Sequence, residues 1–509
     1  MTLNQNIRKD TGMNFKENPR RLPRWQVWII GLFCLGLLVV SGKYVSASTA
    51  IFEEHAENAS NFIYVPVVLL NNLQMPTFGI ESNQLMFKGS EILDRGTALG
   101  VNWARLGNRV SWEKLQPNPG VAIDWSQLEK FEKELIALKE VGMTPLVTVQ
   151  RYPHWAVQDA RLDHQLTSCG PLRADTFDEF AEFMRALVNR YKVPQYDVHN
   201  WELGNEPDVD PDLLPVDWGF GCWGDINDPF YGGKHYGEMI KLVSQAIKEA
   251  DPTATVWLGG LLLATPETSD PNYGKPELFF KGVLEAGAAP YFDVVGYHWY
   301  PPYLNVVDDH DLSEGKWADW GGGTIGKAQF LRQTMDEYGV DKPLVLNETG
   351  LMCVESSSYC NPMPVPAFYE MQADNLIRSF VRGLSVDVEG FIWYTLNGPG
   401  WRFTGLLDEN NDPYQAYFAY QHLALQLNNA RYTGVVNHAS GVEAYSFRRG
   451  SEVVQVIWTR ANDVIPITFP VAKFLAAYDR AGNPIVPTPV GDNYEINARF
   501  TPTFVVLNP

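Results

Sequence analysis

Between residues 77 and 394, short apolar runs with the composition of β-strands alternate with longer amphipathic stretches. This alternation constrains the fold most, because strand, helix and further strand form the unit from which parallel sheets are built. Eight strand-like runs are present: Thr77–Glu81, Val101–Leu106, Thr144–Gln150, Val198–Leu203, Thr255–Gly260, Phe292–His298, Pro343–Asn347 and Gly390–Tyr394.

Apolar residues between these runs recur at spacings of three and four, as they do in amphipathic helices. The stretches are Trp125–Val141, Thr176–Tyr191, Tyr236–Ala250, Gly326–Tyr338 and Tyr369–Leu384. Eight strand–helix alternations predict an α/β fold, a closed (β/α)8 or TIM barrel. A doubly wound open sheet is the alternative.

The length of 509 residues leaves room for a barrel of about 250–400 residues and a smaller module. After Asn428 the pattern changes to short alternating runs separated by Gly, Pro and Asn. These runs are Val442–Phe447, Val453–Thr459, Ile465–Phe469 and Thr503–Leu507. We therefore predict a linker at 48–74, the barrel at 75–428 and a small antiparallel β-sandwich at 429–509.

The first 47 residues have the pattern of a targeting segment. Trp25–Gly42 is almost entirely apolar and follows Arg20, Arg21 and Arg24. A length of about 18 residues is marginal for a membrane span and long for the apolar part of a signal peptide. The basic flank predicts a cytoplasmic N-terminus and export of the rest. A cleaved signal, for which Val45-Ser46-Ala47 offers a cleavage site, and an uncleaved anchor associated with the membrane both remain open.

Five cysteines fit an exported chain. One of them lies in the apolar segment, which leaves an even number in the exported part, as disulfides require. Cys353 and Cys360 share one loop, so we expect them to pair, and we expect Cys169 to pair with Cys222. The chain has no cysteine and histidine spacing that resembles a zinc site.

The formal net charge is −20, and 16 Trp contribute to an aromatic content of 13%. Nucleic acid is not an expected partner, because phosphate binding needs clustered Lys and Arg. Trp and Tyr side chains can stack on the apolar faces of sugar rings, although most of them belong to the core. The sequence leaves the oligomeric state open.

Two segments, Trp201-Glu202-Leu203-Gly204-Asn205-Glu206-Pro207 and Leu344-Val345-Leu346-Asn347-Glu348-Thr349-Gly350, indicate the chemistry. Each begins as an apolar strand and ends in a glutamate beside a turn signal. The C-terminal ends of barrel strands carry the active site, so Glu206 and Glu348 are expected to face each other across the barrel mouth. A lone glutamate after a strand is usually an exposed loop residue. Two of them on suitable strands are what hydrolysis of a glycosidic bond requires.

The neighbours of these glutamates suggest how the work is divided. Glu206 is the expected acid/base, because a carboxyl group in a desolvated cleft beside a second carboxylate can hold a proton for a leaving oxygen. Asn205 would bind the 2-hydroxyl of the sugar. Glu348, as nucleophile, must stay ionised and needs a cationic or hydrogen-bonding neighbour. Arg105, at the end of the second predicted strand, and Tyr300, after the sixth, are the candidates.

Other polar and aromatic residues at strand ends are weaker candidates. His154 and His298 are expected to contact the substrate or the glutamates. Trp393 is either the floor of a sugar subsite or a core residue. Glu202 lies within a strand, where an internal hydrogen bond is expected, and His199 is more consistent with a core histidine than with a ligand.

In these motifs the chain resembles the retaining glycoside hydrolases of clan A, whose (β/α)8 barrels carry catalytic glutamates at strands four and seven. The resemblance covers roughly residues 77–425 and extends to the cellulase-like family 5 and the xylosidase/iduronidase-like family 39, which has a terminal β-sandwich. It implies Glu206 as acid/base beside Asn205, Glu348 as nucleophile, and binding roles for Arg105, His298, Tyr300 and Trp393. One departure is that Asn347-Glu348-Thr349-Gly350 lacks the Trp often found after the nucleophile.

The expected function is that of a secreted or membrane-anchored retaining glycosidase acting on a plant or microbial polysaccharide, or on its oligosaccharides. We expect no metal or organic cofactor, because two carboxylates suffice. The alternative is a catalytically inactive, carbohydrate-binding barrel at the cell surface. A metal-dependent barrel hydrolase is disfavoured, because the nine histidines include no His-x-His pair at a strand end.

Overall fold

The structure is a computed structural model, and it describes residues 78–82, 90–107, 109–158, 169–213, 221–267, 272–313 and 315–509. The predicted targeting segment at 1–47 and linker at 48–74 lie outside this part. Within the described residues, no helix combines the length and apolar character that a membrane crossing requires.

Among the described residues, eight parallel strands close into a barrel, as predicted. They are β1 (Phe78–Ser82), β2 (Trp103–Leu106), β4 (Thr144–Gln150), β5 (Asn200–Leu203), β6 (Thr255–Leu261), β7 (Val294–Trp299), β8 (Leu344–Thr349) and β9 (Val388–Tyr394). Neighbouring strands in this order pair with each other, β2 pairs directly with β4, and β9 pairs with β1. A short additional strand, β3 (Val110–Ser111), pairs with the end of β4. The open-sheet alternative is therefore wrong.

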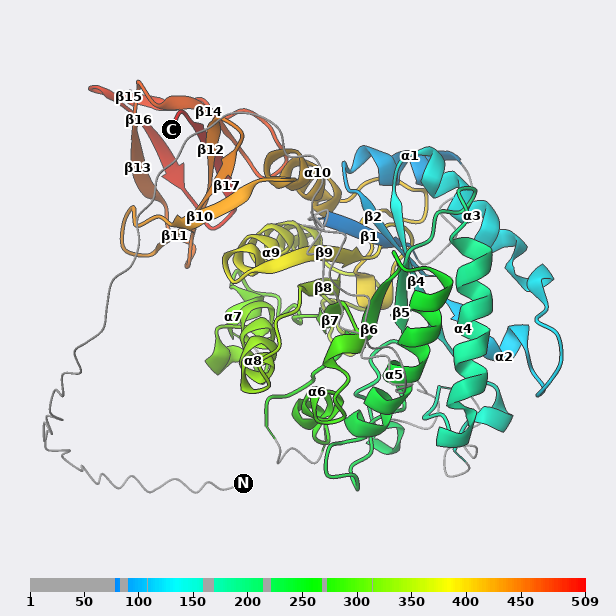
Figure 1. The fold of residues 1–509 in the computed structure, drawn as a ribbon. Coiled ribbons are helices and arrows are strands. Elements are labelled where there is room, and N and C mark those ends of the chain that lie inside the picture. The colour runs from blue at the N-terminus through cyan, green and yellow to red at the C-terminus, as the bar shows by residue number, and fades with distance from the viewer. Residues whose placement is uncertain are drawn as a thin grey trace, which may run out of the picture. The chain divides into compact units, whose positions relative to one another are not determined.

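Helices surround the strands (Figure 1). The larger ones are α1 (Ser90–Ala98), α3 (Glu129–Glu140), α4 (Phe177–Tyr191), α5 (Gly233–Ala250), α6 (Pro276–Glu285), α8 (Gly323–Glu337), α9 (Pro366–Ser385) and α10 (Gln415–Leu427). α2 (Trp112–Leu115) and α7 (His310–Ser313) are single turns. The amphipathic stretches singled out in the sequence do not include α1, α6 and α10. α10 is buried on most sides and lacks the narrow apolar stripe of a surface helix.

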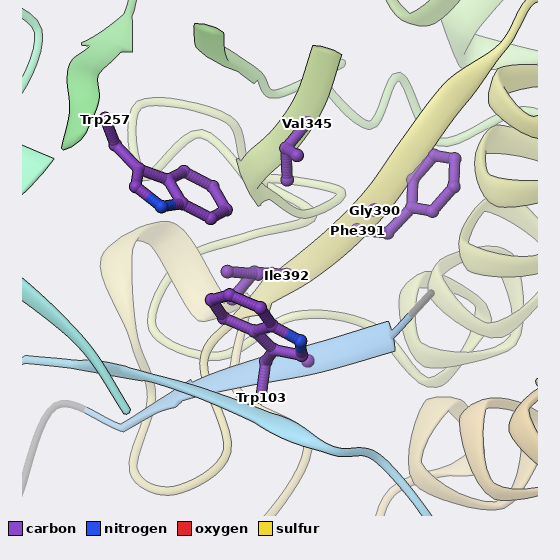
Figure 2. Close-up of a pocket in the computed structure, with 7 residues that line it drawn as sticks. Trp103, Trp257, Val345, Gly390, Phe391 and Ile392 are labelled. Atoms are coloured by element: carbon purple, nitrogen blue, oxygen red, sulfur yellow. The ribbon is translucent and has the colours of Figure 1, made fainter. Parts of the chain in front are cut away.

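Large side chains fill the N-terminal half of the barrel. Trp103 and Trp257 pack with ring centroids 5.4 Å apart, and Val345 and Ile392 close the cluster. Figure 2 shows these side chains lining a small pocket beside β9. Because this half is packed with apolar groups, polar chemistry is confined to the C-terminal ends of the strands.

Two antiparallel sheets follow the barrel. The larger has the order β10-β11-β12-β17-β14 and the smaller β13-β16-β15. Their strands are β10 (Arg431–Val435), β11 (Val442–Arg449), β12 (Glu452–Thr459), β13 (Ile465–Pro470), β14 (Phe474–Tyr478), β15 (Thr488–Val490), β16 (Asn493–Ala498) and β17 (Thr503–Leu507).

The larger sheet is apolar on both faces. Ile457 and Val505 face a core shared with the smaller sheet, whereas Val456, Trp458 and Phe504 belong to the main core that contains the barrel. Adjacent residues of a strand point to opposite faces, so strands with continuous apolar runs are expected here.

A buried arginine joins the two parts. Arg382 of α9 donates to Asp309 at 2.7 and 3.0 Å and to Glu443 of β11 at 2.8 and 2.9 Å. All three residues are at least 93% buried. The guanidinium of Arg378 lies 3.6 Å from the ring centroid of Phe500 beside β17. The buried charge of Arg382 has both of its carboxylate partners only when the barrel and the C-terminal sheets are both folded.

Candidate active site

The backbone after β5 turns sharply and presents Glu206 at the mouth of the barrel. Gly204 and Glu206 have φ angles of +92° and +49°, a region that is uncommon for residues other than glycine. The Glu206 amide donates to the Gly260 carbonyl at 2.9 Å, which fixes the turn against the end of β6. The sequence Gly-Asn-Glu-Pro therefore ends the strand and positions the glutamate.

Glu348 lies in β8, and its carboxylate approaches that of Glu206. Each residue is 8% exposed. One carboxylate oxygen of each lies within 4.8 Å of the other and of a ring nitrogen of His298. The two predicted glutamates therefore meet in a single buried site at the C-terminal ends of the strands.

Positive charge and a hydroxyl group surround Glu348. Arg105 Nη1 donates to Oε2 at 2.6 Å, and the Tyr300 hydroxyl donates to Oε1 at 2.5 Å. Burial alone would raise the pKa of Glu348, but His298, Arg105, Arg109 and the Tyr300 hydrogen bond outweigh it. Together they hold the pKa well below its ordinary value, so this carboxylate is ionised and acceptor-only.

Arg105 organises the floor of the site. Its Nη1 also contacts Glu81 at 2.6 Å, its Nε donates to Glu202 at 2.8 Å, and its Nη2 donates to Asn205 Oδ1 at 2.7 Å. Burial opposes the charge, but the coulombic attraction of Glu202, Glu81 and Glu348 raises the pKa of Arg105. Glu202 also accepts from the Gly260 amide and the Asn347 side chain, which fits the internal role expected for it.

His298 lies beneath the two glutamates. Its Nδ1 is 2.9 Å from Glu206 Oε1 and 3.7 Å from Glu348 Oε2, and its side chain is fully buried. Gly260 makes room for this ring, since a Cβ at that position would lie 2.1 Å from His298 Nε2. The histidine therefore contacts the glutamates, whereas its burial separates it from a sugar.

Two of the predicted residues lie elsewhere. The side chain of His154 is 59% exposed, and its ring pairs with Glu113 at 3.5 Å, whereas the residues in contact with Glu206 and Glu348 are His298, Arg105, Arg109 and Tyr300. Trp393 is fully buried, and its indole donates to the Thr404 carbonyl at 2.9 Å. It packs on Phe380 of α9, so it is a core residue in this structure and offers no face to a sugar. Because neighbouring strand residues point to opposite faces, the next residue takes the inward position.

That residue, Tyr394, is half-buried and lies 6.4 Å from the Tyr300 ring. Trp401, in the loop after β9, is 39% exposed and lies 5.1 Å from Tyr300. The guanidinium of Arg402 stacks on Trp401 with its carbon 4.4 Å from the ring centroid. Tyr394 and Trp401, which both contact Tyr300, are therefore the aromatic side chains beside the glutamates, and of the two roles expected for Trp393 the structure shows the core one.

Two further charged residues lie beside Glu348 that were not among the residues expected from the sequence. Glu81 ends the first predicted strand and is 1% exposed, so the signal that identified Glu348 was present there too. Arg109 Nη2 lies 3.8 Å from Glu348 Oε2 and 3.9 Å from Glu81 Oε1. It comes from the loop after β2, where no strand-end rule identifies it.

Both predicted disulfides are present. Cys353–Cys360 and Cys169–Cys222 each have Cα atoms 5.5 Å apart. The Cys353 amide donates to the Arg402 carbonyl at 2.9 Å, so the first bridge braces the loop that carries Trp401. Disulfides of this kind belong to chains that fold outside the cytoplasm.

The spacing of Glu206, His298 and Glu348 resembles a set of metal ligands. However, the same carboxylate of Glu348 already contacts Arg105 at 2.6 Å and Arg109 at 3.8 Å. A divalent cation would have to enter beside two guanidinium groups, which is electrostatically unfavourable. The donor set fits a carboxylate held by arginine better than a metal centre.

A model of the cellulase family, glycosyl hydrolase family 5, matches residues 65–373. No curated protein matches the chain significantly.

Solved structures share the fold at low sequence identity. A family 39 glycoside hydrolase from Bacteroides cellulosilyticus is 18% identical with a TM-score of 0.62, covering 86% of this chain and 82% of the other. A monomeric β-xylosidase from Caulobacter crescentus is 16% identical with a TM-score of 0.55, covering 85% and 96%. A family 30 xylanase from Clostridium acetobutylicum is 13% identical with a TM-score of 0.54, covering 85% and 96%.

Proposed function

Because the chain belongs to the cellulase family, glycosyl hydrolase family 5, and so hydrolyses O-glycosyl bonds, we propose that it does so with retention of the anomeric configuration. In this proposal Glu348 is the nucleophile and Glu206 the acid/base. The observation that carries it is the approach of their carboxylate oxygens to within 4.8 Å. Retaining enzymes hold the two carboxyl groups about 5–5.5 Å apart, whereas inverting enzymes need about 6.5–9.5 Å to admit a water.

The first half-reaction uses the asymmetry of the site. Glu348 attacks the anomeric carbon, the bond to the leaving oxygen breaks, and Glu206 gives that oxygen its proton. Arg105 and Tyr300 fix both oxygens of Glu348, so one lone pair is aimed at the sugar without rotation of the carboxylate. The product of this step is a glycosyl ester of Glu348.

The second half-reaction reverses these roles. Glu206, now ionised, removes a proton from water as the water oxygen attacks the anomeric carbon and the ester bond breaks. His298, 2.9 Å from Glu206, holds that carboxyl group in one orientation for both steps. Arg105 holds the Asn205 oxygen, which turns the amide nitrogen of Asn205 toward the site, where it can donate to the 2-hydroxyl of the sugar.

The substrate we propose is a plant or microbial polysaccharide or its oligosaccharides. Similar folds include xylanases, a β-xylosidase and a glucosidase, so β-xylosides and glucosides come first in a screen. Tyr394 and Trp401 are the aromatic surfaces we assign to sugar stacking. The two disulfides support export, and we propose residues 1–47 as the targeting segment, cleaved or retained as an anchor.

The stereochemical test is proton NMR of the first sugar released from an aryl glycoside. Retention is expected, and an inverted first product would contradict the assignment. Glu348→Ala should abolish turnover, while Glu206→Ala should slow substrates with poor leaving groups far more than those with activated ones. Glu337→Ala, an exposed change on α8, is the matched control and should leave all rates unchanged.

A further inference from the structure

Glu81 is a third carboxylate in the site that the double-displacement scheme does not use. It ends β1 and is 1% exposed. Its backbone carbonyl accepts from the Thr395 hydroxyl and the Leu396 amide, each at 2.8 Å, which ties it to the end of β9. The residue is therefore fixed in place and hidden from a sugar.

The side chain of Glu81 shares one donor with the nucleophile. Arg105 Nη1 lies 2.6 Å from Glu81 Oε2 and 2.6 Å from Glu348 Oε2. Arg105 is fully buried, and a buried cation that loses its partner is strongly destabilising. Ester formation removes one of the three carboxylate partners of Arg105, because the negative charge of Glu348 is consumed when its oxygen bonds to carbon, and it leaves Glu81 and Glu202 in place.

We propose that Glu81 is a positioning residue that keeps the charge of Arg105 balanced while Glu348 carries the sugar. The inference rests on the proposed function. When the Glu348 ester forms, its carboxylate charge disappears and the leaving group departs with a proton from Glu206. When water cleaves the ester, the charge returns to Glu348 and the proton to Glu206. Through both changes Arg105 keeps Glu81 and Glu202, of which Glu81 is the one that shares the Nη1 donor with Glu348.

The electrostatics of Glu81 respond to this cycle in the required direction. Burial, together with the like charge of Glu348, raises the pKa of Glu81 above its ordinary value, although the charges of Arg105 and Arg109 act in the opposite direction. The contribution from Glu348 vanishes in the ester, so the pKa of Glu81 falls. The ionised form of Glu81 is therefore favoured in the step at which Arg105 has lost the charge of Glu348.

This role predicts opposite effects on the two half-reactions. Without the charge of Glu81, Arg105 would stabilise the free carboxylate of Glu348 more strongly than the neutral ester. In Glu81→Gln, formation of the glycosyl-enzyme should slow on the order of tenfold, and its hydrolysis should accelerate by a similar factor. General damage to the site would slow both steps.

The two rates can be measured separately on the full-length protein. A 2,4-dinitrophenyl 2-deoxy-2-fluoroglycoside of the sugar that the parent cleaves fastest forms the glycosyl-enzyme at a rate read from dinitrophenol release. After the excess reagent is removed, the recovery of activity with time gives the rate at which the glycosyl-enzyme is hydrolysed. Glu81→Asp, which keeps the charge, should stay close to the parent, and Glu337→Gln on the surface should match it.

A second variant keeps the inference testable if Glu81→Gln fails to fold. Arg109 lies 3.8 Å from Glu348 and its side chain is 25% exposed, so Arg109→Gln spares the core. Removing this cation makes the free carboxylate less favourable, and reactivation should slow. Parallel changes in both rates for Glu81→Gln, no change in either, or faster reactivation in Arg109→Gln would overturn the inference. Absence of a mass-shifted Glu348 peptide in the treated parent would instead refute the proposed function.

Discussion

Replacing Arg105 with Met tests the electrostatic account of the site most directly. The guanidinium contacts Glu81 and Glu348 at 2.6 Å and Glu202 at 2.8 Å, and its side chain is fully buried. Each charge-assisted hydrogen bond contributes about 1.5–3 kcal/mol, but contributions within one network do not add. Loss of one partner from a buried ion cluster costs about 3–5 kcal/mol, and we expect that decrease in the free energy of unfolding.

The pH dependence of this decrease follows from the sign of the pKa shift. The folded-state pKa of Glu348 lies below its unfolded value of about 4.3, so its ionisation stabilises the fold above that pH. This contribution is lost as the pH falls through the depressed folded value. The difference between Arg105→Met and the parent should therefore be largest near pH 7 and shrink toward pH 3.

Urea unfolding followed by tryptophan fluorescence measures the stability difference, and kcat/KM against pH reports the nucleophile. In Arg105→Met the acid limb of kcat/KM should move to higher pH, and kcat/KM at pH 7 should fall roughly 100-fold. Arg185→Met is the matched control, because Arg185 also pairs with two glutamates, Glu182 and Glu249, both on the surface. Its cost should be about 0–1 kcal/mol. Equal losses in the two variants would refute the reasoning.

Three further changes probe the surroundings of the glutamates. Trp401→Ala should raise KM for oligosaccharides several-fold through lost stacking and leave kcat for a small aryl glycoside nearly unchanged, in steady-state assays of both substrates. Replacing Cys353 and Cys360 with Ser opens a loop of seven residues' separation and should cost about 2–3 kcal/mol in urea unfolding. Gly260→Ala should displace His298 and reduce kcat at least tenfold, while circular dichroism shows an intact barrel.

The barrel was predictable because its signal is repeated along the chain. The first and last residues of each of the eight strands lie within three residues of the ends of the corresponding apolar run. The positions of Glu206 and Glu348 at strand ends then follow from the topology of the barrel. Glu81 also lies at the end of a predicted strand. In a chain with 60 acidic residues, however, that position alone does not distinguish Glu81 from other acids unless its contact with Arg105 is known. Its importance comes from Arg105, whose reach across strands is a three-dimensional property.

The aromatic residues beside Tyr300, which are Tyr394 and Trp401, could not be identified from sequence patterns. Trp393 and Tyr394 are adjacent in one strand, and only the side that faces the barrel axis decides which meets the substrate. The part of β9 from Gly390 to Tyr394 is a continuous apolar run, which has no polar alternation to reveal that side. Trp401 lies in a loop, where no periodicity applies, and the structure alone brings it against Tyr300.

The ion pair between Arg382 and Glu443 limits how the barrel and the C-terminal sheets can be combined with parts of other proteins. The change from helices to strands after Leu427 looks like a place to exchange one C-terminal module for another. A foreign module would have to supply, at the same time, an acid opposite Arg382 and an apolar face equivalent to Val456 and Trp458. We therefore expect the barrel and the C-terminal sheets to be inherited together, and an engineered exchange of the sheets alone to destabilise the protein. Foreign sequence is better inserted at exposed turns such as 461–463.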